Sequence, residues 1–298
     1  MEKNVILYSL RSGIVFCTLY RETYEWFVQR KANFADKIQA LFVWGGVIKF
    51  DQNLLKSLFN LKAVVNGGVG VDHLDIPLIN SFGVKVSNTP HVVDNATADI
   101  GMSLMLASAR KIVEDEGHSF SKFRDGATLG IIGMGRIGYK DEMFEMKILY
   151  HNRNRRSESD ERAVGATYFA SMKELLQRSD FVMVVVNLSP QMHKLIGAKE
   201  FAVMKPNSTF INISRGLVVD QDALVNALQK KMIRAAALDV TYPELLPRDH
   251  PLLSFPNVIV LPHVGIHTVE TSQIMVERMV TNALAAVTGG QLPDEVKA

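Results

Sequence analysis

Short runs of apolar, often β-branched residues recur along the chain and alternate with stretches that have a helical pattern. The runs are apolar at consecutive positions, which is typical of strands buried on both faces of a parallel sheet. The expected strands lie within residues 63–72, 84–89, 128–133, 146–151, 180–186, 209–214, 235–240 and 258–263. Helical patterns lie between them, for example at residues 171–179 and 220–231. This alternation predicts an α/β protein with a parallel sheet and right-handed crossovers.

Length and composition describe a globular chain with room for two domains. Its 298 residues are 47% apolar and 21% charged, so we expect a large buried core rather than disorder. The formal net charge is +2, which argues against nucleic acid as the main partner. Cys17 is the single cysteine, so the chain can form neither an intrachain disulfide nor a cysteine-based metal site.

Nothing in the sequence predicts a membrane contact. No apolar run approaches the ~18 residues of a membrane-spanning helix. The first residues, MEKNVILYSLRSG, lack the apolar core and the cleavage pattern of a signal peptide. A lone cysteine also suits a reducing compartment. We therefore expect a cytoplasmic protein without a metal centre.

A glycine-rich turn follows the expected strand at residues 128–133. It has the pattern G-x-G-x-x-G and is followed by a short helical stretch and another strand. Glycine lets the backbone approach a pyrophosphate, and the N-terminus of the next helix offers unpaired N–H groups. We therefore predict that this turn binds a dinucleotide, with an ordinary glycine-rich turn as the alternative. The residues expected at the cofactor are Gly133, Gly135, Arg136, Ile137 and Gly138.

The next expected strand ends in a basic turn. Its sequence, HNRNRR, occupies residues 151–156, where an enzyme that uses NAD would carry an acid to bond the ribose 2′-hydroxyl. An acid would repel a 2′-phosphate, whereas a guanidinium pairs with it through two hydrogen bonds. The alternative is a solvated basic loop on an enzyme that uses NAD. We predict a preference for NADPH, carried mostly by Asn152, Arg153 and Asn154 and helped by Arg155.

Three later apolar runs each deliver one polar side chain, namely Arg215, Glu244 and His263. The arginine fork matches a substrate carboxylate and can polarise the adjacent keto oxygen. A histidine can give a proton to a developing alkoxide at neutral pH, and a carboxylate on its far ring nitrogen would orient it. Beside a nicotinamide, this set is what the reduction of a 2-keto acid needs. A surface arginine and a structural histidine are the alternatives.

The order TLGIIGMGRIG, INISRG, ALDVTYPE and LPHVG resembles the D-isomer-specific 2-hydroxyacid dehydrogenase family. FINISRG and LDVTYPELLPRDHPLL are most similar to its glyoxylate/hydroxypyruvate reductase branch, which includes 2-ketogluconate reductases. The likeness covers nearly the whole chain. It implies an NADPH-dependent oxidoreductase that reduces glyoxylate, hydroxypyruvate or 2-ketogluconate to the D-2-hydroxy acid.

The resemblance also implies the domain organisation. A Rossmann-type doubly wound parallel sheet would form the NAD(P)-binding domain at residues 96–270. A second, flavodoxin-like α/β domain at residues 1–95 and 271–298 would bind the substrate. A long helix at residues 96–114 would link the two domains, and a C-terminal helix near residues 271–288 would return to the second one.

Residue roles follow from the same resemblance. Glu244 and His263 would act together as the proton donor. The substrate would be bound by Val69, Gly70, Arg215, Asp239 and His263, and the cofactor would be lined by Thr97, Asn187, Leu188, Ile213, Asp239 and Gly265. Two alternatives stay open, because Asp239 could simply cap a strand end, and the loop NGGVG at residues 66–70 could be a tight turn without a ligand.

The chain departs from the family in two short segments and one turn. Residues 139–146 are about one helical turn shorter than in the family, and residues 117–126 replace a longer segment that often contacts the partner subunit. The resemblance implies a homodimer, and this second shortening weakens that inference. Ile266 and His267 replace small residues, and Ile266 would narrow the substrate pocket.

A second hypothesis from another class follows from these departures. A catalytically impaired NAD(P)-binding homologue would act as a sensor or interaction protein and bind NADPH without turnover. The presence of Arg215, Glu244 and His263 argues against it, and the short crossover argues for it. A phosphoglycerate dehydrogenase is disfavoured by the basic turn.

Overall fold

The computed structural model describes residues 4–8, 20–23, 35–44, 48–114, 126–138 and 146–297. They belong to two compact units, one formed by Met1–Val93 with Thr268–Ala298 and the other by Asp94–His267. The short segments singled out at residues 117–126 and 139–146 lie outside the described residues, apart from Gly126 and Met146. Within the described ranges, no helix is long and apolar enough to cross a membrane.

The unit formed by Asp94–His267 is built on a parallel sheet with the order β12-β11-β10-β9-β6-β7-β8. All neighbouring strands in it are parallel. The strands are β6 (Thr128–Ile132), β7 (Lys147–His151), β8 (Ala166–Tyr168), β9 (Phe181–Val184), β10 (Thr209–Asn212), β11 (Ala235–Leu238) and β12 (Val258–Val260). From β6 the sheet grows toward β8, and from β9 it grows the opposite way toward β12. The sheet is therefore doubly wound, and its switch point lies between β6 and β9.

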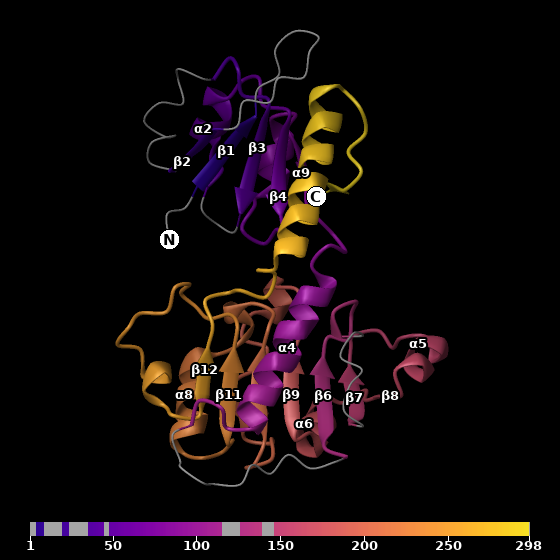
Figure 1. The fold of residues 1–298 in the computed structure, drawn as a ribbon, viewed down its shortest axis with the longest axis vertical. Helices are drawn as coiled ribbons and strands as arrows, with labels where there is room; N and C mark the ends of the chain where they lie inside the picture. The colour runs from indigo at the N-terminus through magenta and orange to yellow at the C-terminus, as the bar shows by residue number, and fades with distance from the viewer. Residues whose placement is uncertain are drawn as a thin grey trace. The chain divides into compact units, whose positions relative to one another are not determined.

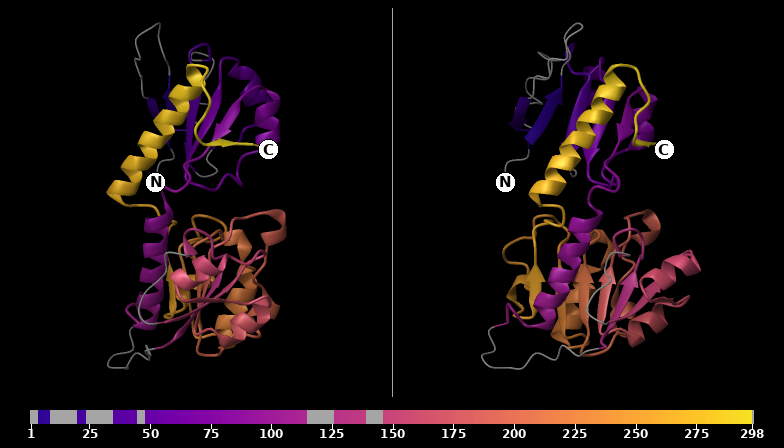
Figure 2. Two further views of the ribbon diagram at one scale, coloured as in Figure 1. Left: turned by 90° about the vertical axis from the view of Figure 1, so that its right-hand side faces the viewer. Right: turned by 45° about the vertical axis from the view of Figure 1, so that its right-hand side comes forward.

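Helices cover both faces of this sheet. They are α4 (Asp94–Ala109), α5 (Glu158–Ala163), α6 (Met172–Arg178), α7 (Ala198–Phe201) and α8 (Gln221–Gln229), with short 3₁₀ turns η3 (Pro190–Met192), η4 (Gly216–Val218) and η5 (Pro251–Ser254). Figures 1 and 2 show α4 along one face, where it packs on β10, β11 and β12, and α6 packs on β6 and β7 from the other face.

Alternate residues of β9 explain why its sequence is apolar throughout. Val182 and Val184 of β9 pack into the cluster that contains residues of α6 and α8. Phe181 and Met183, which point the other way, pack into the cluster that contains Met105 of α4. Both sets are nearly inaccessible to solvent. β9 therefore buries both of its faces, as its consecutive apolar positions predict.

The linking helix is shorter than the sequence suggests. We expected helix at residues 96–114, but α4 begins at Asp94 and ends at Ala109. Lys111 takes a left-handed backbone with φ 54°, and the N–H of Ile112 bonds back to the carbonyl of Ala107 at 2.9 Å. This is a helix C-terminal cap of the kind usually made by glycine, so no glycine marks the end in the sequence.

The other unit contains a mixed sheet with the order β13-β5-β4-β3-β1-β2. Its elements are β1 (Asn4–Tyr8), β2 (Tyr20–Thr23), β3 (Ala40–Trp44), α2 (Gln52–Ser57), β4 (Ala63–Gly67), α3 (Ile76–Ser81), β5 (Lys85–Ser87), α9 (Val269–Val287) and β13 (Glu295–Val296). The inner strands β3, β4 and β5 are parallel, whereas β1 and β13 pair antiparallel with their neighbours. The α/β class and the Rossmann-type sheet are confirmed, and the edges of this second sheet are antiparallel.

The C-terminal helix α9 joins this unit through one buried face. Met275, Met279, Ala283 and Ala286 recur at helical spacing and are buried, and the helix packs on β3 and β4. Thr268 caps it, since its side chain accepts a hydrogen bond from the N–H of Thr271 at 3.0 Å. The last part of the chain is therefore part of the core of the unit that contains the first strands (Figure 1).

Candidate active site

The glycine turn follows β6 at the switch point of the parallel sheet. Gly133 has φ 98°, and a Cβ there would lie 2.5 Å from the carbonyl oxygen of Val185, so only glycine fits. A Cβ at Gly138 would lie 3.0 Å from Ile131 Cγ2, which indicates close packing against β6. At Gly135 the nearest atom would be 3.9 Å away. Two glycines are thus needed for folding and the third leaves open space, which fits a bound dinucleotide pyrophosphate.

Arg136 in this turn is paired with an acid that the sequence analysis did not single out. Its Nε lies 2.8 Å from Oδ2 of Asp94, in the first turn of α4. The guanidinium is 63% exposed and the carboxylate 8%. Ile137 is half-buried against the cluster on the α4 side of the sheet. The charge of Arg136 is therefore shared with Asp94 before any phosphate arrives.

The basic turn after β7 is held next to the glycine turn. Asn152 donates from Nδ2 to the carbonyl oxygen of Met134 at 3.1 Å, so it contacts the residue between Gly133 and Gly135. Arg153 and Asn154 are exposed, and within the described ranges their side chains have no hydrogen bond or ion pair. These three residues are the ones from which the sequence predicts most of the 2′-phosphate contacts.

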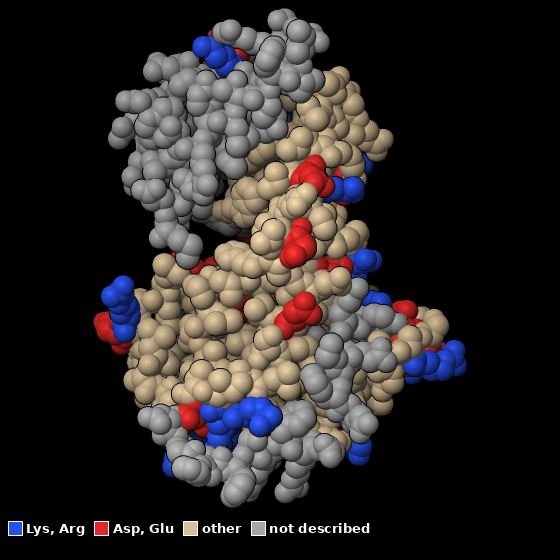
Figure 3. All heavy atoms as spheres, viewed as in Figure 1, with Lys and Arg blue, Asp and Glu red and all other residues tan. Residues whose placement is uncertain are grey.

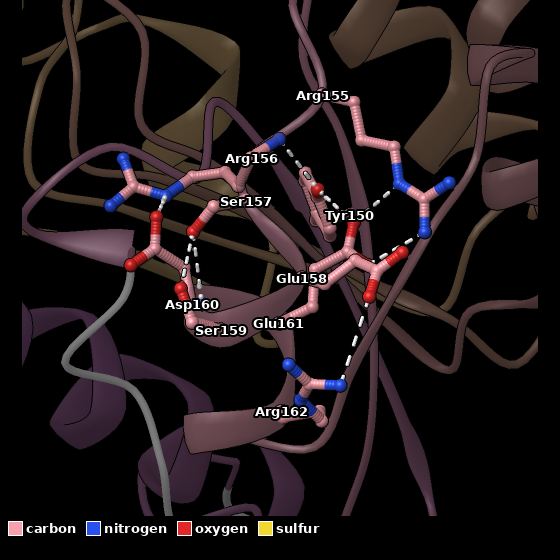
Figure 4. A network of polar contacts seen from close by, with 9 residues as sticks. All are labelled: Tyr150, Arg155, Arg156, Ser157, Glu158, Ser159, Asp160, Glu161 and Arg162. Atoms are coloured by element: carbon pink, nitrogen blue, oxygen red, sulfur yellow. Dashed lines mark hydrogen bonds and ion pairs between the residues drawn. The ribbon is translucent and has the colours of Figure 1, made fainter.

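Arg155 makes a different set of contacts. Its Nε and Nη2 donate to the two carboxylate oxygens of Glu161 in α5, at 2.8 and 2.7 Å. The hydroxyl of Tyr150 donates to the same carboxylate at 2.6 Å. Figure 4 shows Arg155 and Tyr150 meeting at Glu161. The Arg155 guanidinium and then the Tyr150 hydrogen bond lower the pKa of Glu161 to about 2, so this carboxylate is ionised at neutral pH.

Arg215 lies directly after β10, in a turn organised by a buried asparagine. The Oδ1 atom of Asn212 accepts from the N–H and the hydroxyl of Ser214, at 3.0 and 2.8 Å, and its Nδ2 donates to the carbonyl of Arg215 at 3.0 Å. A Cβ at Gly216 would lie 2.1 Å from the backbone of Thr241. The asparagine and the glycine therefore fix the backbone from which the half-buried Arg215 side chain extends.

His263 and Glu244 are in contact. The Nδ1 atom of His263 lies 3.1 Å from Oε2 of Glu244, and the side chains are 39% and 42% exposed. Because Nδ1 faces the carboxylate, Nε2 is the ring nitrogen left for a substrate. The structure thus brings together the two residues that the resemblance assigns to proton transfer, from sequence positions nineteen residues apart.

Asp239 fixes the turn that carries His263. Three consecutive N–H groups donate to it: that of His263 to its carbonyl at 2.8 Å, and those of Val264 and Gly265 to its carboxylate at 2.8 and 3.0 Å. These bonds hold His263 at φ 57°, a left-handed conformation that a non-glycine residue rarely takes. Asp239 is 1% exposed. Of its two interpretations, the contacts are those of a cap on a strand end.

Gln221 is a further residue of the site that sequence analysis did not identify. Its side-chain amide donates to the carbonyl of Tyr242 at 2.8 Å and accepts from the N–H of the same residue at 3.1 Å. This pairing ties the start of α8 to the loop that carries Glu244. A glutamine at the start of a helix carries no distinctive signal, because its partner is a backbone group far along the chain.

The remaining predicted cofactor residues lie in different surroundings. Thr97 is buried near Gly265, where its Cγ2 would lie 3.7 Å from an added Cβ. Asn187 is exposed and Leu188 is half-buried after β9. Ile213 is 5% exposed. Its Cδ1 atom would lie 2.9 Å from a Cβ added at Gly101 of α4. Ile213 therefore packs against α4, which explains its burial without a ligand.

The loop at residues 66–70 belongs to the other unit and has its carbonyl groups turned inward. Asn66 donates from Nδ2 to the carbonyls of Gly68 and Gly70, at 3.2 and 2.9 Å, and Asn88 donates to that of Val69 at 2.8 Å. No hydrogen bond is seen from the N–H of Val69 or Gly70 to a described residue. Such free donors suit an anion.

Charges of both signs are mixed on the surface. Figure 3 shows blue and red side chains next to each other on the visible face, including at α5. There the ion pair of Arg162 and Glu158 is exposed on both sides. In the described part of the chain, no group of three or more His, Cys, Asp or Glu residues is placed to hold a metal ion.

Comparisons with known proteins show the family of the chain. The family model described as the D-isomer specific 2-hydroxyacid dehydrogenase, NAD binding domain, matches residues 102–265. Glyoxylate/hydroxypyruvate reductase B of Escherichia fergusonii is 40% identical over 263 residues, which span 82% of this chain and 81% of that protein.

Solved structures give the same result. A glyoxylate reductase from Paecilomyes thermophila matches with a TM-score of 0.81 and 32% identity, over 91% of this chain and 88% of that one. An NADPH-dependent glyoxylate/hydroxypyruvate reductase from Sinorhizobium meliloti, in complex with NADP and malonate, matches with a TM-score of 0.78 and 31% identity, over 89% and 85%. The chain therefore belongs to the D-isomer specific 2-hydroxyacid dehydrogenase family and is an NAD(P)-dependent oxidoreductase.

Proposed function

We propose that the protein uses NADPH to reduce glyoxylate and hydroxypyruvate to D-2-hydroxy acids, with 2-ketogluconate as a third substrate. The contact of His263 with Glu244 at 3.1 Å is the observation that carries this proposal. A histidine held by a carboxylate at one nitrogen is ready to give a proton from the other. The names of the relatives, glyoxylate and hydroxypyruvate reductases, support the same substrates.

The side chains divide the reaction between them. Arg215 would hold the substrate carboxylate and polarise the keto oxygen. For the loop with Val69 and Gly70, substrate binding stays the prediction that the resemblance implies. Bound NADPH would supply the hydride that the keto carbon accepts. As the electron pair of the carbonyl moves to oxygen, Nε2 of His263 would give its proton there, completing the hydroxyl group. Glu244 would hold the imidazolium that donates it.

The preference for NADPH is part of the proposal. Arg153 is exposed on the turn whose Asn152 contacts the glycine turn at 3.1 Å. An arginine in that place can pair with a 2′-phosphate, whereas an acid would repel it. The related reductase of Sinorhizobium meliloti is NADPH-dependent, which supports the same choice here.

The test follows the absorbance of NADPH while purified protein is mixed with each keto acid, with NADH in a parallel series. We expect oxidation with at least one of the three acids and a clear preference for NADPH. Gly135→Ala tests the glycine turn, because the atom nearest to its added Cβ would be 3.9 Å away and the fold would stay intact. It should lose activity by filling the space kept for the pyrophosphate.

The opposite result has a definite meaning. If folded wild-type protein binds NADPH but oxidises it with none of the acids, the reductase proposal is wrong and the sensor hypothesis takes its place.

We also propose a homodimer in a reducing compartment such as the cytosol, in keeping with the family and with the single Cys17. Light scattering of the purified chain measures the first of these.

A further inference from the structure

The basic turn after β7 is tied down at both of its ends. At the start, His151 Nδ1 lies 2.8 Å from the carbonyl of Phe169, and the hydroxyl of Tyr168 donates to the carbonyl of Asn152 at 3.3 Å. At the end, the N–H of Arg156 donates to the hydroxyl of Tyr150 at 3.0 Å. The backbone of the turn is therefore held by groups of β7 and of the chain around β8.

A buried carboxylate completes the second anchor. Glu161 is 7% exposed and receives three hydrogen bonds, two from Arg155 and one from the Tyr150 hydroxyl. Tyr150 is fully buried. The Arg155 guanidinium also lies 5.7 Å above the ring of Tyr168, within the range of a cation–π contact. Both oxygens of this carboxylate thus accept hydrogen bonds from protein side chains (Figure 4).

The two arginines at the middle of the turn have different freedom. Arg153 is exposed and has no ion pair with a described residue. Arg155 donates two hydrogen bonds from its guanidinium to Glu161, at 2.7 and 2.8 Å. The Nε–Nη2 edge of Arg155 would have to break both of its bonds to the buried carboxylate before that edge could turn toward a phosphate.

We propose that Arg155, Glu161 and Tyr150 form a positioning network that presents Arg153 to the 2′-phosphate, and that Arg155 is not itself a phosphate ligand. Glu161 is then a specificity-determining residue although it never touches the cofactor. This inference rests on the proposed NADPH preference and goes beyond it, because it gives Arg155 a positioning role where the sequence predicts a helping phosphate contact.

The opposite arrangement gives an opposite prediction. If Arg155 bound the phosphate and Glu161 only competed for it, removing the acid would release the arginine and tighten binding of the phosphate. If Glu161 holds the turn in place, removing it weakens that binding. The sign of the change in Glu161→Gln therefore distinguishes the two arrangements.

The experiment measures the dissociation constants of adenosine 2′,5′-bisphosphate and adenosine 5′-monophosphate by calorimetry on the full chain. The two probes differ only in the 2′-phosphate, so their ratio reports on that group alone. The variants are Arg153→Gln, Arg155→Gln, Glu161→Gln and the double variant Arg155→Gln with Glu161→Gln. Glu158→Gln is the matched control, since it removes one negative charge from α5 where the side chain is 78% exposed and forms an ion pair with Arg162.

We expect Arg153→Gln to weaken bisphosphate binding by about 10–100-fold, as the loss of a charge-assisted pair should. Glu161→Gln and Arg155→Gln should each weaken it about fivefold, and the double variant no further, because both changes break one network. Binding of the monophosphate should stay within about twofold in all variants, and Glu158→Gln should match the wild type.

Other outcomes overturn the inference. Tighter bisphosphate binding by Glu161→Gln would make Arg155 a restrained phosphate ligand, and additive losses in the double variant would separate the two residues. If Glu161→Gln does not fold, Tyr150→Phe breaks the same network more gently and should shift the same ratio. Wild-type protein that binds both probes equally would refute the NADPH preference itself, whereas a normal wild-type ratio with no effect of Glu161→Gln refutes only the network.

Discussion

Two acid–base pairs lie after strands of the same parallel sheet, and they are built in opposite ways. Glu161 is buried, accepts two bonds from Arg155 at 2.7 and 2.8 Å and takes a third from Tyr150. Glu244 meets His263 through one contact of 3.1 Å, and both side chains are about two-fifths exposed, at 42% and 39%. One pair is closed by protein groups, and the other is open to a substrate.

The difference shows how structure separates positioning from reaction. A carboxylate whose bonding sites are filled by fixed donors holds a geometry and does not exchange protons near neutral pH. A histidine with one nitrogen held and the other free can give and recover a proton. Buried Asp239 stabilises the left-handed turn of His263, because it accepts hydrogen bonds from three N–H groups of that turn.

The largest effect should come from removing the open pair's proton donor. His263→Ala should lower kcat by about 10²–10⁴-fold, the usual contribution of a general acid. NADPH binding should not change, because the glycine and basic turns are untouched. His193→Ala, which removes an exposed histidine from the same unit, should keep full activity. Retained turnover in His263→Ala would remove this residue from the mechanism.

A smaller effect is expected when only the partner of His263 is changed. Glu244→Gln keeps the size of the side chain but loses the charged oxygen that orients the ring of His263, so kcat should fall by about tenfold or more, and less than in His263→Ala. Steady-state kinetics on both variants checks the order. An unchanged kcat would mean that the 3.1 Å contact has no part in proton transfer.

The closed pair should be visible in the pH dependence of stability. The pKa of Glu161 is lowered from 4.5 to about 2, mainly by Arg155, so its ionised form stabilises the folded chain above about pH 4.5. That contribution is lost as the pH falls toward about 2. The difference in Tm between wild type and Glu161→Gln should therefore be full at about pH 6 and shrink below about pH 4.5.

The control for this pH series is Glu158→Gln, whose exposed side chain should give a Tm close to wild type at each pH. A gap between wild type and Glu161→Gln that stays constant down to the lowest pH would contradict an ionised, arginine-paired Glu161.

The smallest expected effect concerns the phenol of the closed pair. Burial and the bond to Glu161 raise the pKa of Tyr150, so its hydroxyl remains a donor. Tyr150→Phe should lower the free energy of unfolding by about 1.5–3 kcal/mol, the net worth of a hydrogen bond to a charged group. Tyr168→Phe, which loses a longer bond of 3.3 Å at a half-buried site, should cost less. Urea denaturation compares the two.

Much of the fold could be predicted because it depends on local pattern. Strands buried on both faces are mostly apolar, and this marks β9 along its whole length and β6 and β10 at their inner positions. The end of α4 could not be predicted, since it depends on Lys111 in a left-handed conformation, which carries no sequence signal. The sequence shows that positions 133 and 216 are glycines, but only the structure shows which backbone atoms leave no room for a side chain there.

The site divides in the same way. Arg215, Glu244 and His263 stand at the ends of apolar runs, so their places were readable. Their supports were not, because Asn212 acts through hydrogen bonds within its own turn and Gln221 through the backbone of Tyr242, in another segment. The sequence of the basic turn shows its positive charge, but it does not show which arginine is paired with an acid. Only the contact with Glu161, six residues after Arg155, separates the arginine that is held from the arginine that is free.

One measurement tests the contrast between the two pairs most directly: the single-turnover rate of NADPH oxidation by hydroxypyruvate, at saturating NADPH, in His263→Ala and Glu161→Gln. We predict a rate reduced by about 10²–10⁴-fold in the first variant. In the second variant the rate should stay within about twofold of wild type, because saturating NADPH compensates for weaker cofactor binding. Equal losses in the two variants, or a larger loss in Glu161→Gln, would contradict the division into a reacting pair and a positioning pair.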